Sequence, residues 1–191
     1  MFAPDTQEKF NKAREAALEF LPILKGKLIA SDGTLHTGTM LSASAWLTGT
    51  SLHRSLNLQD DLPPGTTIKS DEATREWESL MDMFEQYNLQ MTDIPVGQFI
   101  KAALEAPDWL KPQVEMLYLL KELQGAYNQI MKKQGFDYLD GARAGVVLCS
   151  IFFQQYCIVN KIMDPNVAAG IVAQGILEAA KTIPPPLAPE N

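Results

Sequence analysis

The sequence predicts an all-α protein: a single-domain bundle of about seven helices, with helices rich in small residues at its centre. Apolar residues recur at helical spacing along most of the 191-residue chain. Prolines, glycines and helix-capping residues separate these stretches. The apolar fraction of 46% and the charged fraction of 20% are typical of a globular domain with its own core. We therefore expect one all-α domain over residues 1–183 and a proline-rich tail over residues 184–191.

The first two helices follow from capping and turn residues. Asp5 and Glu8 have the spacing of a capping box ahead of a helical apolar pattern. Pro22 is expected to kink or end this first helix, because proline removes a backbone hydrogen bond. Asp32–Gly33 marks a turn, and the second helix is expected over residues 35–56.

The next two helices lie between proline-containing loops. A Pro-Pro-Gly loop precedes the third helix, which is expected to begin near Ser70. This helix carries Asp71 and Glu72 in its first turn, where the helix dipole favours acidic residues. A short fourth helix is expected over residues 96–105, and the Ala-Pro-Asp sequence of residues 106–108 breaks the chain again.

The second half of the chain predicts three more helices. Pro112 suits the first position of a fifth helix, which is expected to stop at Gly135 after two lysines. Asp137 opens a sixth helix that runs to about residue 162, and Asp164 opens a seventh that runs to about residue 181. The tail sequence TIPPPLAPEN cannot be helical and is expected to fray or to adopt polyproline II.

The second helix carries a seam of small residues. Its members, Gly38, Ser42, Ala45 and Gly49, fall within about 60° of one another on a helical wheel. Such a seam lets another helix approach closely, and we predict it to be a helix-packing or dimer seam. Because each glycine in a helix interior costs roughly 1 kcal/mol relative to alanine, this helix should persist only when it is packed.

The sixth and seventh helices are also rich in small residues and poor in charge. The seventh has no charged residue from Asn166 to Leu177. We expect these two helices and the second to form the centre, with the charged amphipathic helices around them. Since seven helices offer limited cover for three apolar ones, a homodimer interface is an open alternative for part of this surface.

The charge distribution argues against several classes of partner. The net charge is −7, and residues 57–96 hold nine acidic and two basic residues. A nucleic-acid binder needs clustered lysine and arginine, so neither nucleic acid nor an anionic membrane surface is expected as a partner. The uncharged run from Ala144 to Asn160 is too short and too polar to span a bilayer, and we expect it to be buried in protein.

Cysteine usage indicates a reducing compartment. Cys149 and Cys157 fall in one predicted helix, about 12 Å apart along its axis, which is beyond the reach of a disulfide. The sequence shows no cluster of cysteine and histidine and no secretory signal. A cytoplasmic location is therefore expected.

Two arginines and one histidine are the candidate ligand-binding residues. Arg54 ends an otherwise uncharged helix, where it either complements the helix dipole or binds an anion or carboxylate. Arg143 stands among small residues, where it either pairs with Asp140 on the surface or reaches into a cleft to bind a carboxylate or phosphate. His53 adjoins Arg54. Both His53 and His36 are expected to be partly exposed or to cap a helix, and they lie too far apart to share a metal within one helix.

The acidic third helix raises the question of a metal site. Glu78, Asp82 and Glu85 share one face, a spacing that helical di-metal sites use. No matching pair of acidic ligands occurs on a second helix, so a solvated face is expected and neither a metal nor a cofactor is predicted. The sequence contains no nucleophile-elbow, phosphate-loop or zinc-protease motif. No catalytic residue is therefore predicted, and enzymatic activity stays open.

Three functions are compatible with these features. The first is a cytoplasmic helical protein that acts by self-association, as a homodimer, or by interaction with other proteins. The second is a binder of a small apolar or carboxylated ligand between the central helices, with Arg54 or Arg143 as its anchor. The third is a metal-dependent hydrolase that uses the acidic third helix. The absence of catalytic motifs favours the first.

Overall fold

The structure is a computed structural model that describes residues 4–58, 61–88, 96–105, 107–108, 111 and 115–187. Over these residues the chain forms seven α-helices and a short π-helical segment, which confirms the predicted all-α fold. The elements are α1 (Pro4–Leu28), α2 (Thr37–Ser55), α3 (Asp71–Asn88), α4 (Val96–Leu104), α5 (Met116–Lys133), α6 (Tyr138–Phe153), η2 (Gln154–Val159) and α7 (Pro165–Ala180).

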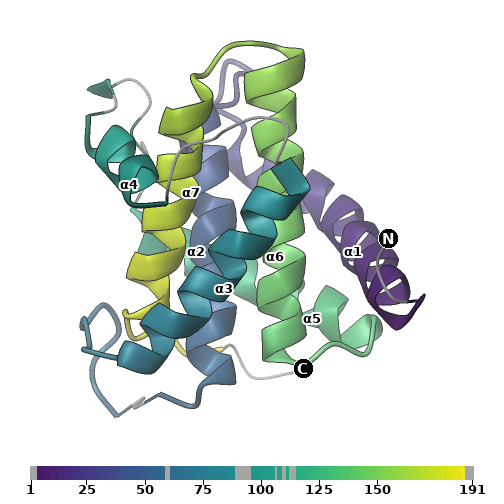
Figure 1. Ribbon diagram of the computed structural model, residues 1–191, viewed down its shortest axis with the longest axis vertical. Coiled ribbons are helices and arrows are strands. Elements are labelled where there is room, and N and C mark those ends of the chain that lie inside the picture. Colours follow the sequence, from purple (N-terminus) through teal and green to yellow (C-terminus); the bar gives the residue numbers. More distant parts are fainter. Residues whose placement is uncertain are drawn as a thin grey trace.

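The three helices predicted for the centre lie together. Helix α2 contacts α7 on one side and α6 on another, and α6 runs antiparallel to both (Figure 1). Helix α4 packs on α7, α1 packs on α6 and α5, and α3 crosses the front of α6 and α7 (Figure 1). The predicted arrangement, with small-residue helices enclosed by the others, is confirmed.

The contact between α2 and α7 is close because glycines on both helices leave room for it. A Cβ atom at Gly49 would collide with the carbonyl oxygen of Ile176 and lie 2.7 Å from the Cβ atom of Ala179. A Cβ atom at Gly175 would lie 2.8 Å from the Cβ atom of Ala45. The predicted seam is buried throughout; its members are Gly38, Ser42, Ala45 and Gly49. From Ser42 to Gly49 the seam therefore packs against α7 within one chain.

Several buried hydroxyl side chains of α2 bond to the helix itself. Ser44 donates to the carbonyl oxygen of Met40 at 2.9 Å, and Thr48 donates to that of Ser44 at 2.8 Å. Ser51 repeats the pattern with Leu47 at 3.0 Å. These bonds satisfy polar groups that would otherwise be costly in a buried helix.

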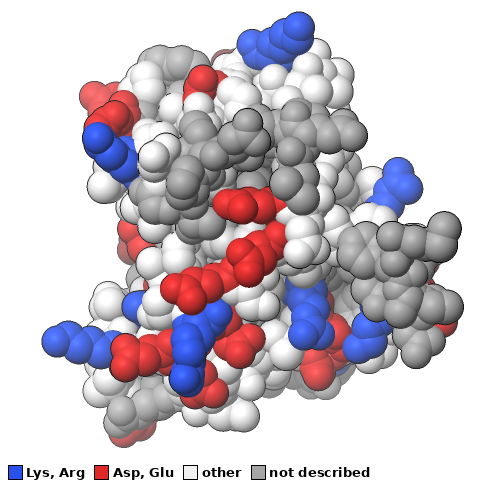
Figure 2. Space-filling model, viewed as in Figure 1, with Lys and Arg blue, Asp and Glu red and all other residues white. Residues whose placement is uncertain are grey.

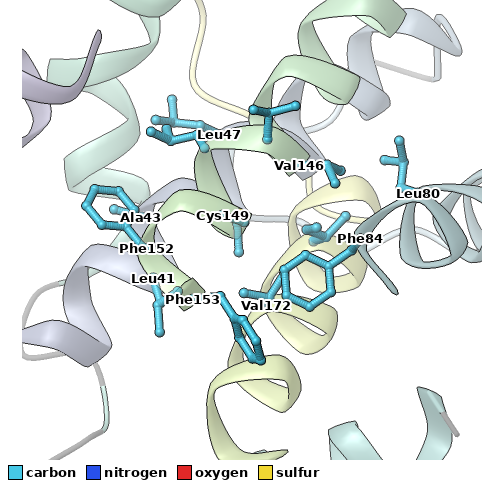
Figure 3. Close-up of a cluster of buried hydrophobic side chains, with 14 of the residues drawn as sticks. Leu41, Ala43, Leu47, Leu80, Phe84, Val146, Cys149, Phe152, Phe153 and Val172 are labelled. Atoms are coloured by element: carbon cyan, nitrogen blue, oxygen red, sulfur yellow. The ribbon is translucent and has the colours of Figure 1, made fainter. Parts of the chain in front are cut away.

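One cluster of large core side chains lies where α3, α6 and α7 meet. Figure 3 shows Phe84, Phe153 and Val172 directed toward one another, with Leu80 and Val146 close by. The rings of Phe84 and Phe153 are in edge-to-face contact, with their centroids 5.4 Å apart. The indole N–H of Trp77 donates to the carbonyl oxygen of Ala173 at 2.9 Å and fastens α3 to α7.

Two helix boundaries differ from the prediction. Of the two alternatives for Pro22, an end of the helix is wrong, because α1 continues to Leu28, and a kink stays a prediction. Phe20 and Leu24, which flank the proline, are fully buried, so packing on both sides outweighs the lost hydrogen bond. The sixth helix ends at Phe153 and continues as the π-helical segment to Val159. Pro112, predicted to start the fifth helix, lies outside the described residues.

One helical stretch, Tyr138–Val159, is long and apolar enough to cross a membrane among the described residues, and 67% of its most apolar window is buried inside the protein. A core helix of a globular protein has the same composition. That the protein does not enter a membrane stays a prediction.

The segment after α7 neither frays nor extends freely over its described part. Thr182, Ile183, Pro184 and Pro185 are buried, and Thr182 forms an antiparallel bridge with Thr67. Of the two alternatives for the tail, fraying is therefore wrong for residues 182–187, and polyproline II stays a prediction. Sequence pattern alone missed this docking because it depends on partners far away in the chain.

Candidate functional site

Arg54, the first candidate ligand-binding residue, lies between α5 and the segment after α7. Its Nη2 donates to the carbonyl oxygen of Pro185 at 2.8 Å and to the side-chain oxygen of Gln124 at 3.1 Å. Arg54 therefore helps to hold the chain's own tail in place. A role in binding a separate ligand stays a prediction.

The two histidines occupy different environments. His36 caps α2, because its Nδ1 accepts a hydrogen bond from the backbone N–H of Thr39 at 3.1 Å. His53 is fully buried, so the expectation of partial exposure is wrong for this residue. Its Nδ1 lies 3.1 Å from the carbonyl oxygen of Ala180 and donates to it, since a carbonyl only accepts. His53 thus ties the end of α2 to the end of α7.

Arg143 lies on the surface. Its guanidinium forms an ion pair with Asp140 at 3.3 Å, as the first of the two sequence interpretations expected. Lys9 of α1 approaches the same carboxylate oxygen at 3.3 Å. An exposed pair of this kind contributes at most about 1 kcal/mol. The structure thus places Arg143 and Arg54 on different elements with different partners.

The acidic residues of α3 gather on one outer face of the molecule. Figure 2 shows a band of acidic side chains that follows α3 across the front. Among the described residues, no group of three histidine, cysteine or acidic side chains is placed to hold a metal ion. Glu78, Asp82 and Glu85 thus lack second-helix ligands among the described residues.

A hollow of about 250 Å³ lies where the end of α2 meets the end of α5 and the start of α6. This is the lower end of the bundle in Figure 1. Its lining comes from α2 (Ser51), α5 (Asn128, Met131 and Lys132), the following turn (Phe136 and Asp137) and α6 (Tyr138 and Gly141). Ser51, Met131 and Gly141 are buried and form its floor, whereas Lys132 and Asp137 are exposed at its rim.

The turn between α5 and α6 positions one wall of the hollow. Gly135 has φ of +74°, a conformation that glycine adopts without strain. The backbone N–H of Phe136 donates to the carbonyl oxygen of Met131 at 3.0 Å, which closes the end of α5 in a Schellman motif. The carboxylate of Asp137 then accepts from the backbone N–H of Asp140 at 2.8 Å and caps α6. The end of the fifth helix at Gly135 and the start of the sixth helix at Asp137 were both predicted from the sequence, and both are confirmed.

A buried hydrogen bond holds the floor of the hollow. The hydroxyl of Tyr127 donates to the carbonyl oxygen of Gly141 at 2.7 Å. Burial raises the pKa of this phenol, so the hydroxyl keeps its proton and remains a donor. A Cβ atom at Gly141 would lie 3.5 Å from Met131 Cγ and 3.7 Å from Ser51 Oγ, which is ordinary contact distance. The missing methyl group therefore contributes to the empty space.

The wall of the hollow contains one polar group without a partner. The side-chain amide nitrogen of Asn128 is buried and donates to no atom of the described residues. An unsatisfied buried donor costs about 1–3 kcal/mol. The hollow is otherwise mostly apolar, with charges of opposite sign, those of Lys132 and Asp137, at its rim.

A second hollow, of about 380 Å³, lies beside α2, α4 and α7 and includes Trp46 and Leu104 in its lining. Two of its polar side chains have partners, since Gln174 donates to Glu178 at 2.7 Å and Lys111 donates to Asp108 at 2.6 Å. None of its described lining residues has a buried polar side-chain atom without a partner. It therefore lacks the unsatisfied donor that distinguishes the smaller hollow.

The cysteines show no sign of an activated nucleophile. Cys149 and Cys157 are free thiols and both are buried. Burial raises the pKa of each thiol to about 12. Because the thiolate is the reactive form, both side chains are inert near neutral pH.

Sequence reasoning did not identify Asn128 as a site residue. The fifth helix is rich in apolar residues, although Gln124 and Asn128 interrupt this pattern one turn apart. Two amide side chains among inward-facing residues could have indicated a site, because buried polar side chains need partners. Gln124 finds its partners within the chain.

No protein-family model, curated protein or solved structure matches this chain. The hollow therefore has to be interpreted from its own chemistry.

Proposed function

We propose that the protein binds a small, uncharged, mostly apolar molecule in the hollow between α2, α5 and α6. The observation that carries the proposal is the buried Asn128 amide nitrogen, which has no partner and stands in an apolar wall. A carbonyl or ether oxygen on the ligand would accept from this amide. Because this nitrogen is covered by neighbouring protein atoms, the Asn128 side chain has to turn toward the hollow for a ligand oxygen to reach it.

The dimensions limit the ligand to a small molecule. The hollow measures about 250 Å³, whereas sites for drug-sized ligands measure about 300–1,000 Å³. A single ring with one short substituent is therefore the expected scale. The proposal narrows the ligand expected from the sequence, a small apolar or carboxylated molecule, to the uncharged case, because Lys132 and Asp137 offset each other at the rim.

Titration calorimetry with a matched pair of probes tests the proposal. Acetophenone has an apolar ring and one carbonyl acceptor, whereas ethylbenzene has nearly the same shape and no acceptor. We expect acetophenone to bind at least about fivefold more tightly, which corresponds to one ordinary hydrogen bond. Equal affinities, or no heat from either probe at its solubility limit, would refute the proposal.

The homodimer expected from the sequence needs a surface other than the predicted seam. The seam packs against α7 within one chain, so it is not free to contact a second copy. Light scattering at high micromolar concentration tests self-association. A purely monomeric protein would refute the homodimer hypothesis. The cytoplasmic location of the protein remains an expectation from the sequence.

A further inference from the structure

The segment after α7 lies in a groove that pairs with its backbone. The backbone N–H of Ile68 donates to the carbonyl oxygen of Lys181 at 2.7 Å. Gly65 donates to the carbonyl oxygen of Ile183 at 2.9 Å, and Ile183 donates back to Thr66 at 2.9 Å. These three bonds align residues 181–183 with the loop before α3.

Beyond these residues, buried side chains bind the carbonyl oxygens of consecutive prolines. Gln124 is 3% exposed, and its amide nitrogen donates to the carbonyl oxygens of Pro185 at 3.2 Å and Pro186 at 3.1 Å. Arg54 donates to the carbonyl oxygen of Pro185 at 2.8 Å and also to the side-chain oxygen of Gln124 at 3.1 Å. Two donors from separate helices thus converge on one carbonyl group.

This pattern of donors suits proline. A proline residue has no backbone N–H, so its main chain offers only an acceptor. The polyproline II conformation is also populated before binding, which lowers the entropy lost on docking. The groove supplies donors to carbonyl oxygens and buries the rings of Pro184 and Pro185.

The chain's own segment does not fill the groove. A hollow of about 430 Å³ remains between residues 183–187 of that segment and the loop residues Leu62 and Pro64, beside Arg54. A docked segment with unfilled space next to it is one that another segment can replace or extend.

We propose that this groove is a binding site for a proline-rich segment of a partner protein, with consecutive prolines that follow an apolar residue. The chain's own Ile-Pro-Pro-Pro segment, residues 183–186, occupies the site in competition with the partner. Because a tethered segment acts at an effective concentration in about the millimolar range, it weakens binding of the partner without abolishing it.

Fluorescence anisotropy with a labelled peptide of the sequence KTIPPPL tests the proposal on the full chain. One protein is the wild type, and the other carries Pro184→Gly, Pro185→Gly and Pro186→Gly, which removes the competing prolines. We expect the peptide to bind the triple variant at least about tenfold more tightly than the wild type. A control peptide in which alanine replaces the three prolines should bind neither protein.

The substitution Gln124→Leu, added to the triple variant, tests whether the peptide binds in this groove. We expect it to weaken peptide binding at least about tenfold, because two hydrogen bonds are lost. Flat anisotropy up to millimolar peptide on the folded triple variant overturns the proposal, and so does binding that Gln124→Leu leaves unchanged.

If the triple variant does not fold, the wild type answers the question. Unlabelled peptide at millimolar concentration should move the backbone amide resonance of Leu187 toward its position in a free segment. A Leu187 resonance that stays in place at the highest peptide concentration overturns the proposal.

Discussion

Helix α2 has a closed contact with α7 and, around Ser51, an open contact with the end of α5 and the start of α6. At the closed contact, a Cβ atom on Gly49 would collide with the backbone of α7. At the open contact, a Cβ atom on Gly141 would find its nearest neighbour, Met131 Cγ, at 3.5 Å. Gly49 therefore permits close packing of two helices, whereas Gly141 leaves unfilled space beside it.

The difference between the two contacts lies in what stands opposite each glycine. Across from Gly49 stands the backbone of another helix, which cannot move aside without disturbing α7. Across from Gly141 stand side chains, including the flexible Met131. A small residue in a helix is therefore not itself a sign of a site. It becomes one when its surroundings are unfilled and include a polar group without a partner.

The largest expected effect comes from closing the space at the tight contact. Gly49→Ala places a methyl group against the carbonyl oxygen of Ile176. We expect the free energy of unfolding to fall by about 2 kcal/mol or more, because overpacking outweighs the gain in helix propensity. Urea denaturation measures this change. A variant as stable as the wild type would mean that α7 is not held closely against α2.

The same substitution at the open contact should have the opposite effect on stability. Gly141→Ala makes only ordinary contacts, so we expect the free energy of unfolding to stay the same or to rise by up to about 1 kcal/mol. The new methyl group occupies the hollow, and the affinity for acetophenone should fall at least about tenfold.

Gly125→Ala is the matched control for this variant. Gly125 lies in α5, and a Cβ atom there would meet nothing within 4 Å. It should gain a similar helix stability of up to about 1 kcal/mol and leave acetophenone binding unchanged. Equal loss of binding in both variants would place the probe outside the hollow.

Removing the unsatisfied amide should stabilise the empty protein. Asn128→Leu replaces a buried donor without a partner by an apolar group of similar size. We expect the free energy of unfolding to rise by about 1 kcal/mol. The preference for acetophenone over ethylbenzene should vanish in the same variant. Lower stability would show that the Asn128 amide already has a partner in solution.

The smallest expected effect concerns a buried polar atom away from the hollow. One carboxylate oxygen of Glu85 is buried without a partner, and burial, with the nearby Asp82, raises the pKa of this carboxyl. An acid whose pKa rises on folding binds its proton more tightly in the folded state. Stability is therefore lost as the pH rises from the unfolded pKa through the folded pKa.

The variant Glu85→Gln removes this pH dependence. We expect a slightly higher melting temperature than the wild type at neutral pH and no difference in acid, below the ordinary glutamate pKa of about 4.3. Melting curves at both pH values check this. A gain that persists in acid would indicate a cause other than the charge of Glu85.

The features predicted from the sequence are those decided by neighbouring residues. Gly135 and Asp137 ended and began helices as expected, because capping depends on a few adjacent groups. The seam of α2 was also recognisable, since helical spacing determines which residues share a face. These local rules were sufficient for the all-α class and the central helices.

The features that sequence reasoning missed depend on residues far apart in the chain. Pro22 stays within a helix because the core holds Phe20 and Leu24. Residues 181–187 dock because Gln124 and Arg54 supply donors from two other helices. Asn128 was missed for the opposite reason: its importance comes from a partner that is absent, and no local pattern reports that.

The most direct test of the open contact is the side-chain amide resonance of Asn128 in the full chain, followed by nuclear magnetic resonance. Titration with acetophenone should shift both amide protons in a saturable way, while ethylbenzene should shift them less and only at higher concentration. If acetophenone moves neither proton at its solubility limit, the hollow is not a binding site and the central claim is wrong.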